Sequence, residues 1–261
     1  MKAIRDLPYV PRGHPRQSGD VFLPDTPSGR APALLIHGGG WNAMNRTNFE
    51  CVVKHFVAAG RAVFNINYRL LDHAPWPACG DDCITAARFL LEGGLAGAGV
   101  PATNRIVICG ASAGGHLAMM TGLGLPPERV AAIISMAGPS HLAFREGSCA
   151  EDLPTSRFRR RFFGAAADAT REQIESASPA CRVKPGAPPL FCIQSRNDTL
   201  VPPAQSQLAV DAWQRAGNRA ELFAFDGPGR LHGLFTSDDL ESRELIPEVA
   251  AIIARLLAQL S

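Results

Sequence analysis

The chain has 261 residues, of which 46% are hydrophobic and 19% charged, and its formal net charge is +2. This length suits a single α/β domain over residues 1–261, because such folds often run past roughly 200 residues undivided. The small net charge gives no support for a nucleic-acid partner. No apolar run reaches the length of about 18 residues that predicts a membrane span.

Residues 1–17 lack the apolar segment of a secretory signal peptide. We therefore expect a cytoplasmic protein, unless a leader has been cleaved from the chain. The first predicted strand, Asp20–Leu23, follows this segment. Short apolar runs then alternate with helical patterns as far as the C-terminus.

The second predicted strand is the apolar run Ala33–Ile36, and it leads directly into a glycine-rich loop, His37–Trp41. Glycines at this place let backbone N–H groups turn toward the oxyanion that develops during acyl transfer. We therefore predict that Gly38 or Gly39 donates one hydrogen bond of an oxyanion hole. Trp41 has two interpretations, as a wall of the acyl pocket that binds substrate or as a core tryptophan.

Helical spacing follows at Phe49–Ala59, then an apolar strand at Ala62–Tyr68 and a further helix at Asp81–Glu92. Tyr68 and Arg69 end a strand beside the predicted oxyanion loop. We expect these two side chains to brace that loop and not to contact substrate.

The most informative motif is the run Gly110–Gly115, which contains G-x-S-x-G and follows the β-branched strand Arg105–Cys109. A serine at this position is held on a sharp strand-to-helix turn. Small residues flank it because the two backbones come too close for side chains. Ser112 is thus the candidate nucleophile, with a helix predicted over His116–Gly122. The N–H of Ala113 is the second candidate oxyanion donor.

A strand is predicted at Val130–Met136, and the least regular part of the chain, Gly138–Pro179, follows it. We expect this segment to form a short cap-like insertion near the active site. Within it, Arg157–Phe163 combines arginines with phenylalanines, which favours an amphipathic helix with a solvated arginine face. The alternative is a surface that recognises an acidic or aromatic acyl group.

A nucleophilic serine needs an imidazole to accept its proton and a carboxylate to orient that imidazole. In a strand–elbow architecture the chain order is serine, then acid, then histidine. Asp198 is the preferred acid, because it follows the predicted strand Leu190–Gln194, at the edge of the sheet where sites are built. Asp226 and Asp238 are its rivals.

The preferred base is His232, which lies in the loop after the predicted strand Ala220–Phe225. His141 precedes every acid considered, and His116 lies on the elbow helix, so both are disfavoured. The loop position and the C-terminal location both favour His232.

Two more helices are predicted, at Ala204–Ala216 and Glu244–Leu260, and the second has an apolar face at helical spacing. Apolar strands that alternate with helices imply a mostly parallel sheet with helices on both faces. The predicted class is therefore α/β.

The seven cysteines are odd in number and irregular in spacing. Cys109 and Cys192 lie within predicted core strands and read as small hydrophobic residues. No second cysteine pair or histidine pair completes a zinc set. We therefore expect reduced thiols, no metal and no cofactor.

Five segments together are typical of one group of proteins: HGGGW (37–41), INYRL (66–70), GASAGG (110–115), NDTLVP (197–202) and His232-Gly233. With these segments the chain resembles the α/β-hydrolase esterases. That group includes hormone-sensitive-lipase-like carboxylesterases, feruloyl-esterase-like (BD-FAE type) proteins and kynurenine formamidases. The resemblance covers the chain from about Asp20 to its end. It implies the α/β-hydrolase fold and serine hydrolysis.

The chain departs from the hormone-sensitive-lipase-like branch, in which the elbow usually reads GDSAGG and an APE segment follows the tyrosine motif. Here the elbow has Ala111, and the later segment reads Ala-Pro-Trp-Pro at 74–77. The N-terminal run Asp20–Pro24 is also closer to the feruloyl-esterase-like and formamidase branch. These departures argue against lipase-like activity.

The leading hypothesis is a serine carboxylesterase that acts on small esters through an acyl-enzyme. Ser112 is its nucleophile, His232 its base and Asp198 the acid that orients the base. One alternative is an arylformamidase, which would hydrolyse N-formylkynurenine with the same triad. Another is a non-catalytic ligand-binding protein on the same fold, although such proteins typically lose a triad member. The expected partner is a small-molecule ester substrate. We expect no nucleic-acid partner and no membrane contact. A homodimer is a possible assembly.

Overall fold

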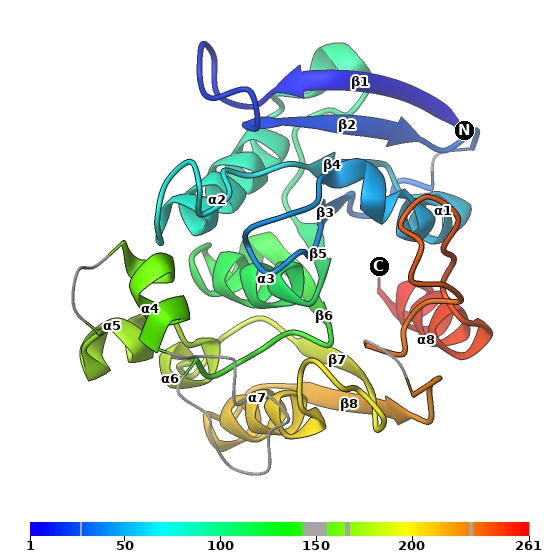
Figure 1. The fold of residues 1–261 in the computed structure, drawn as a ribbon. Helices are drawn as coiled ribbons and strands as arrows, with labels where there is room; N and C mark the ends of the chain where they lie inside the picture. Colours follow the sequence, from blue (N-terminus) through cyan, green and yellow to red (C-terminus); the bar gives the residue numbers. More distant parts are fainter. Residues whose placement is uncertain (27, 143–155, 165–167, 230–231, 261) are drawn as a thin grey trace.

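The computed structural model describes residues 1–26, 28–142, 156–164, 168–229 and 232–260. Within them, eight strands form one sheet in the order β1-β2-β4-β3-β5-β6-β7-β8 (Figure 1). β2 pairs antiparallel with β1 and β4, and the remaining neighbours pair in parallel. The strands are Lys2–Pro8 (β1), Ser18–Leu23 (β2), Ala33–Ile36 (β3), Val63–Ile66 (β4), Ile106–Ala111 (β5), Val130–Met136 (β6), Leu190–Ser195 (β7) and Ala220–Phe225 (β8).

The central strands are apolar on both faces, as buried parallel strands require. Every residue of β3, β5, β6 and β7 is buried. The sequence does not predict β1, because its side chains are mostly exposed and its apolar signal is weak. It lies at the edge of the sheet, where a polar strand is tolerated. β4 is shorter than predicted and ends at Ile66, so that Tyr68 leaves the sheet.

Helices cover both faces of the sheet (Figure 1). Apolar residues of α1 and α8 pack on one face, and those of α2, α3 and α7 pack on the other. The helices are Glu50–Ala58 (α1), Ala78–Leu91 (α2), Ala113–Leu123 (α3), Ser156–Phe163 (α4), Arg171–Ser176 (α5), Pro179–Arg182 (α6), Pro203–Arg215 (α7) and Pro247–Gln259 (α8), with short 3-10 turns at Arg46–Phe49 (η1), Ala96–Ala98 (η2) and Pro127–Arg129 (η3).

The last helix begins later than the sequence predicts. α8 starts at Pro247, where a proline suits the first helical turn because that N–H has no intrahelical partner. Leu245, which is expected on the apolar face of this helix, instead pairs with Phe235 in an antiparallel bridge. Residues 234–246 therefore form a hairpin-like excursion between His232 and α8.

The predicted insertion, Gly138–Pro179, lies partly outside the described residues, which omit 143–155 and 165–167. α4, within it, is amphipathic: Phe162 is fully buried, while Arg160 and Arg161 are exposed. Arg159 forms an ion pair with Asp168 at 2.7 Å. The exposed Arg160 and Arg161 match the solvated arginine face expected from the sequence, whereas Arg159 is buried.

None of the helices in the described ranges combines the length and the apolar character that crossing a bilayer requires. In the same ranges, no three histidine, cysteine, aspartate or glutamate side chains come together as metal ligands. Burial raises the pKa of Cys79 to about 12, so this thiol stays protonated near neutral pH.

Candidate active site

Ser112 lies on the turn between β5 and α3, and its backbone has φ 56°. A positive φ is uncommon for a residue with a side chain, and such strain clusters at functional sites. The turn closes tightly, because a Cβ added to Gly110 would lie 2.1 Å from the Gly114 carbonyl oxygen. The sharp strand-to-helix turn that the sequence predicts at Ser112 is therefore present.

The glycine-rich loop after β3 packs directly against this elbow. A Cβ on Gly38 would lie 2.9 Å from the Ala111 carbonyl oxygen and 3.3 Å from the Cβ of Ser112. Gly39 has φ 102° and Gly40 has φ 59°, conformations that favour glycine. The loop thus brings the backbone of Gly38 beside the serine, and Gly39 lines the same cavity as Ser112.

Ala113 is the first residue of α3, and the preceding Ser112 makes no side-chain capping bond. The first N–H groups of a helix have no intrahelical acceptor and attract negative charge. The Ala113 N–H is therefore one of the helix-start donors beside Ser112. Together with the Gly38 and Gly39 N–H groups, it can serve an oxyanion.

His232 and Asp198 come together although 34 residues separate them in the chain. Nδ1 of His232 lies 3.0 Å from Oδ2 of Asp198, and the Asp198 side chain is completely buried. A carboxylate oxygen only accepts, so Nδ1 carries the proton and donates it to this oxygen. Nε2 is then the basic nitrogen, in a residue that lines the same cavity as Ser112.

The rival residues occupy other positions. Asp226 is exposed and forms an ion pair with Arg196 at 3.2 Å. Asp238 is exposed and lines the cavity, while the acid on His232 is Asp198. The backbone N–H of His141 donates to Gln205 on α7. The structure thus brings together Ser112, His232 and Asp198, the three residues that the sequence favours.

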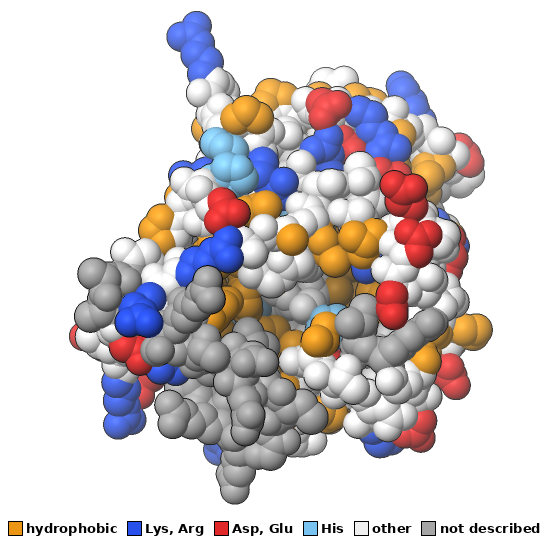
Figure 2. All heavy atoms as spheres, in the orientation of Figure 1, with side chains coloured by type: hydrophobic (Ala, Val, Ile, Leu, Met, Phe, Trp, Pro, Cys, Tyr) orange, Lys and Arg blue, Asp and Glu red, His pale blue; other side chains and the backbone are white. Residues whose placement is uncertain are grey.

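The cavity beside Ser112 has a volume of about 450 Å³. Figure 2 shows this face of the molecule hollowed near its centre, with hydrophobic side chains around the hollow. Glycines of the loop and apolar side chains form most of the lining, and five polar or charged side chains join them. Besides Ser112 and His232, the lining includes Gly38, Gly39, Gly40, Met44, Phe49, Leu200, Leu234, Phe235, Ser237, Asp238, Leu240 and Arg243.

Trp41 does not line this cavity. It is 1% exposed and packs edge-on against Phe162, with ring centroids 5.3 Å apart. Its Nε1–H donates to Nδ1 of His116 at 3.2 Å. The structure therefore supports the core interpretation of Trp41 and corrects its assignment to the acyl-pocket wall. Nothing in the local sequence distinguishes the two, because the partner ring comes from α4.

His116 connects three parts of the fold from inside the core. Its Nε2 lies 2.8 Å from the Ala177 carbonyl oxygen, so Nε2 donates while Nδ1 accepts from Trp41. Burial lowers the pKa of His116 to about 4, which keeps the ring neutral. The His116 ring thus has a structural position, with both nitrogen atoms bonded to Trp41 and to the Ala177 carbonyl.

Tyr68 braces the glycine-rich loop after β3, as expected. Its hydroxyl lies 3.1 Å from the His37 carbonyl oxygen and 3.2 Å from that of Gly38. Its ring stacks on the His37 ring at 4.3 Å. Arg69 differs from the expectation, because its guanidinium binds Asp82 at 2.7 Å instead of the loop.

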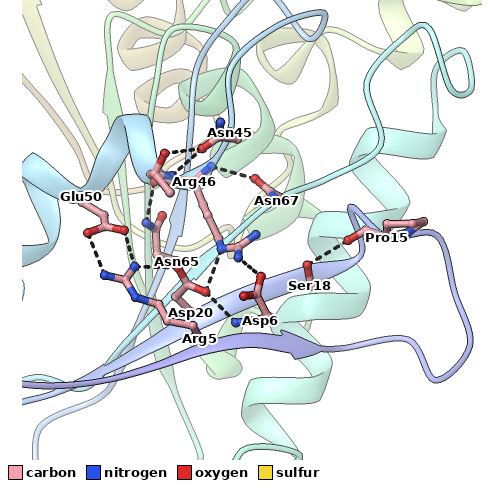
Figure 3. A network of polar contacts seen from close by, with 11 residues as sticks. Arg5, Asp6, Pro15, Ser18, Asp20, Asn45, Arg46, Glu50, Asn65 and Asn67 are labelled. Carbon is pink, nitrogen blue, oxygen red and sulfur yellow. Dashed lines mark hydrogen bonds and ion pairs between the residues drawn. The ribbon is translucent and has the colours of Figure 1, made fainter. Parts of the chain in front are cut away.

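A polar network holds the chain that leaves the oxyanion loop (Figure 3). Arg46, the first residue of η1, forms an ion pair with the buried Asp20 at 2.8 Å and another with Asp6. Burial opposes ionisation of Asp20, but hydrogen bonds from Arg46, the Asp6 N–H and Arg5 outweigh it and lower its pKa. No sequence motif marks this network, because its members come from separate strands.

Two further residues that support the site, Gln194 and Arg16, are not predicted from the sequence. Gln194 lies near the end of β7 inside the core, and its Nε2 donates to Oδ2 of Asp198 at 3.0 Å. Arg16, from the connection between β1 and β2, donates to the carbonyl oxygens of Tyr68 and Met44, each at 2.8 Å. Gln194 could have been predicted from the sequence, because it is a polar residue near the end of a strand. No motif marks Arg16.

The chain is similar to known proteins in sequence and in fold. A profile of the BD-FAE family matches residues 20–212. Esterase LipC of Mycobacterium tuberculosis is 29% identical over 252 residues, which are 88% of this chain and 62% of LipC. Esterase LipQ of the same organism is 28% identical over 258 residues, 94% of this chain and 60% of LipQ. The chain thus spans about 60% of the length of these curated relatives.

Among solved structures, a truncated form of a carbohydrate esterase from gut microbiota is similar in fold, with a TM-score of 0.80. The match covers 99% of this chain and 96% of that chain. At 20% sequence identity the likeness concerns the fold alone.

Proposed function

This chain belongs to the BD-FAE family, and from that premise we propose that it is a serine carboxylesterase that acts on small esters through an acyl-enzyme. The observation that carries the proposal is one constellation: Ser112 on a strained elbow, and His232 held at 3.0 Å by the buried Asp198. Nucleophile and base line one cavity, and backbone donors lie beside them. This arrangement fits acyl transfer better than ligand binding alone.

Acylation needs the serine proton to leave as the new bond forms. Ser112 Oγ attacks the ester carbonyl carbon while Nε2 of His232 accepts the hydroxyl proton. The N–H groups of Gly39 and Ala113 stabilise the oxyanion. When the intermediate collapses, the carbon–alkoxy bond breaks and the imidazolium gives its proton to the leaving alcohol, so the acyl group stays on Ser112.

Deacylation repeats these steps with water as the nucleophile. Nε2 of His232 takes a proton from water as its oxygen attacks the acyl carbon. Collapse of the second intermediate returns that proton to Ser112 Oγ and releases the carboxylic acid. Throughout both steps Asp198 stays ionised and stabilises the imidazolium.

The volume and the lining of the cavity indicate which esters could bind there. Its volume of about 450 Å³ lies at the small end of ligand pockets. Its lining of Phe49, Leu200 and Leu240 suits a short acyl chain or one aromatic ring. A carbohydrate ester is a second test class, because a protein with the same fold is named a carbohydrate esterase.

Initial rates on p-nitrophenyl acetate, butyrate and octanoate, methyl ferulate and N-formylkynurenine test the proposal. We expect hydrolysis of the short or aromatic esters and a lower rate on octanoate. Ser112→Ala should lose most of the activity, on the order of 10⁴–10⁶-fold in kcat, as other triad serines do. A faster rate on N-formylkynurenine than on every ester would identify the formamidase instead.

Labelling with a fluorophosphonate provides the control. The probe forms a covalent bond with an activated serine and should label wild type but not Ser112→Ala. Ser237→Ala is the matched variant, because Ser237 lines the same cavity and its hydroxyl accepts from the Asp239 N–H. Loss of labelling in Ser237→Ala but not in Ser112→Ala would overturn the nucleophile assignment. An unlabelled, inactive wild type would favour the binding protein.

A further inference from the structure

Arg16 reaches from the connection between β1 and β2 to both ends of the loop 37–44. Its Nε donates to the Tyr68 carbonyl oxygen, and a terminal nitrogen donates to the Met44 carbonyl oxygen, both at 2.8 Å. The same terminal nitrogen lies 3.2 Å from Nε2 of His37. The guanidinium therefore ties this loop to the chain just beyond β4.

The loop contains backbone conformations that need such support. Trp41 has φ 57° and Met44 has φ 68°, and both carry side chains. L-residues seldom adopt this region, so surrounding contacts must hold them there. Arg16 and Tyr68 supply hydrogen bonds to the carbonyl groups of this segment.

The contacts of His37 decide which ring nitrogen carries its proton. A guanidinium has donors only, so Nε2, which faces Arg16, is the acceptor. Nδ1 lies 2.7 Å from the Gly38 carbonyl oxygen, which only accepts, so Nδ1 is protonated. Burial lowers the pKa of His37 to about 3, which keeps the ring neutral. One neutral tautomer satisfies both contacts.

The Gly38 carbonyl oxygen thus faces two donors, Nδ1 of His37 and the Tyr68 hydroxyl. In a planar trans peptide the carbonyl and the following N–H point in opposite directions. The Gly39 N–H therefore points away from His37 and Tyr68. Gly38, Gly39 and Ser112 all line one cavity, in which this N–H could meet an oxyanion.

We propose that Arg16 is a positioning residue for ester hydrolysis: it selects the His37 tautomer that holds the Gly38 carbonyl, and so aims the Gly39 N–H at the oxyanion. The effect on ester hydrolysis rests on the proposed function. The hydrogen-bond relay, by which we mean the contacts from Arg16 to His37 and from His37 to the Gly38 carbonyl, does not. Without Arg16, the ring is free to adopt the Nε2–H tautomer. An unprotonated Nδ1 would then face the Gly38 carbonyl oxygen, and the peptide would lose its fixed direction.

Kinetics of Arg16→Met separate positioning from general support, because the methionine keeps an apolar stem. We expect kcat to fall on the order of 10–100-fold with KM nearly unchanged, since an oxyanion donor is misplaced and not deleted. An aryl trifluoromethyl ketone gives the second readout. Ser112 Oγ bonds to its carbonyl carbon, the serine proton passes to His232, and the carbonyl oxygen becomes an oxyanion. Its inhibition constant should rise by a similar factor.

Arg12→Met is the matched control, because Arg12 is an exposed arginine of the same β1–β2 connection. We expect kcat and the inhibition constant of this variant to stay at wild-type values. Equal losses in Arg12→Met and Arg16→Met would overturn the positioning role. So would wild-type kinetics in Arg16→Met.

The tautomer can be measured without any activity, by nitrogen NMR of protein labelled at its histidines. The wild-type His37 signals, assigned from their absence in His37→Phe, should show a protonated Nδ1 and an unprotonated Nε2. Arg16→Met should shift the population toward Nε2–H. A wild-type Nε2–H would overturn the relay. If the wild type hydrolyses no ester, the proposed function fails, and this spectrum still decides whether Arg16 sets the tautomer.

A double-mutant cycle tests whether Arg16 acts through His37. His37→Phe keeps a ring on Tyr68 but removes both nitrogen atoms. On this background Arg16→Met should have little further effect on kcat, because the relay is already broken. The same fold-loss on both backgrounds would show that Arg16 acts independently of His37.

Discussion

Both carboxylate oxygens of Asp198 are occupied by hydrogen bonds. Oδ1 accepts from the backbone N–H groups of Leu200 and Val201, each at 2.8 Å. Oδ2 accepts from Gln194 and from His232, each at 3.0 Å. These donors orient the carboxylate before any substrate binds, so the imidazole meets a fixed acceptor.

Asp198→Asn tests this orientation. The asparagine side chain would keep the shape but present an amide to Nδ1 and favour the wrong histidine tautomer. We expect kcat for p-nitrophenyl acetate to fall on the order of 10³–10⁴-fold, with KM little changed. Asp226→Asn is the control, because that exposed aspartate pairs with Arg196. A large loss in Asp226→Asn with none in Asp198→Asn would reassign the acid.

The turn between β5 and α3 packs closely against β3, and glycines lie at the points of closest approach. A Cβ on Gly114 would lie 2.2 Å from the Ile36 carbonyl oxygen and 2.5 Å from that of His37. These oxygens belong to the backbone and cannot rotate away. Any side chain here would separate the helix that carries the Ala113 N–H from the loop that carries the Gly39 N–H.

Gly114→Ala should therefore lower both stability and activity. We expect the free energy of unfolding in urea to fall by about 2–3 kcal/mol, as overpacking of a tight site does. Gly97→Ala is the control, because a Cβ there meets nothing within 4 Å. It should change the free energy of unfolding by less than about 0.5 kcal/mol. Equal effects of the two substitutions would show that the contact at Gly114 is unimportant.

Across the whole molecule, the site lies where the carboxyl ends of β3, β5, β7 and β8 meet, between helices on both faces (Figure 1). Ligands of open α/β sheets bind at this edge. The interior that supports it contains two completely buried, neutral histidines, His37 and His116. Burial lowers the pKa of His37 to about 3 and that of His116 to about 4, from 6.5.

These histidines make stability depend on pH. Below pH 6.5 the unfolded chain binds a proton at each of them while the folded chain does not, so acidification favours unfolding. Between pH 6.5 and pH 5 we expect the free energy of unfolding to fall by about 1.5 kcal/mol per histidine. The lowered pKa of Asp20 affects the free energy of unfolding only below pH 3.8, the usual pKa of an aspartate, and this range lies outside the window.

Urea titrations at several pH values measure this effect. The control is His116→Gln, which removes one of these two groups and should reduce the fall by about 1.5 kcal/mol. A wild-type free energy of unfolding that stays constant between these pH values would mean that the two rings are not buried as neutral groups.

Much of the architecture is predictable from short segments. The strands Ala33–Ile36, Val130–Met136 and Ala220–Phe225 occur where their apolar runs predict them. The exceptions have physical causes: β1 is a polar edge strand, and α8 begins only at Pro247. The parallel pairing of the central strands is also predictable from the sequence, because strands that alternate with helices form parallel sheets.

The sequence by itself determined Ser112, the glycines around it and the order of its partners. Local backbone sterics decide these features, since only glycine tolerates the close approach at the elbow. The 3.0 Å contact of Asp198 with His232, the core position of Trp41 and the contact of Arg16 with His37 were decided only by the tertiary structure. Each depends on side chains that meet from distant strands and helices, and no spacing along the chain records such a meeting.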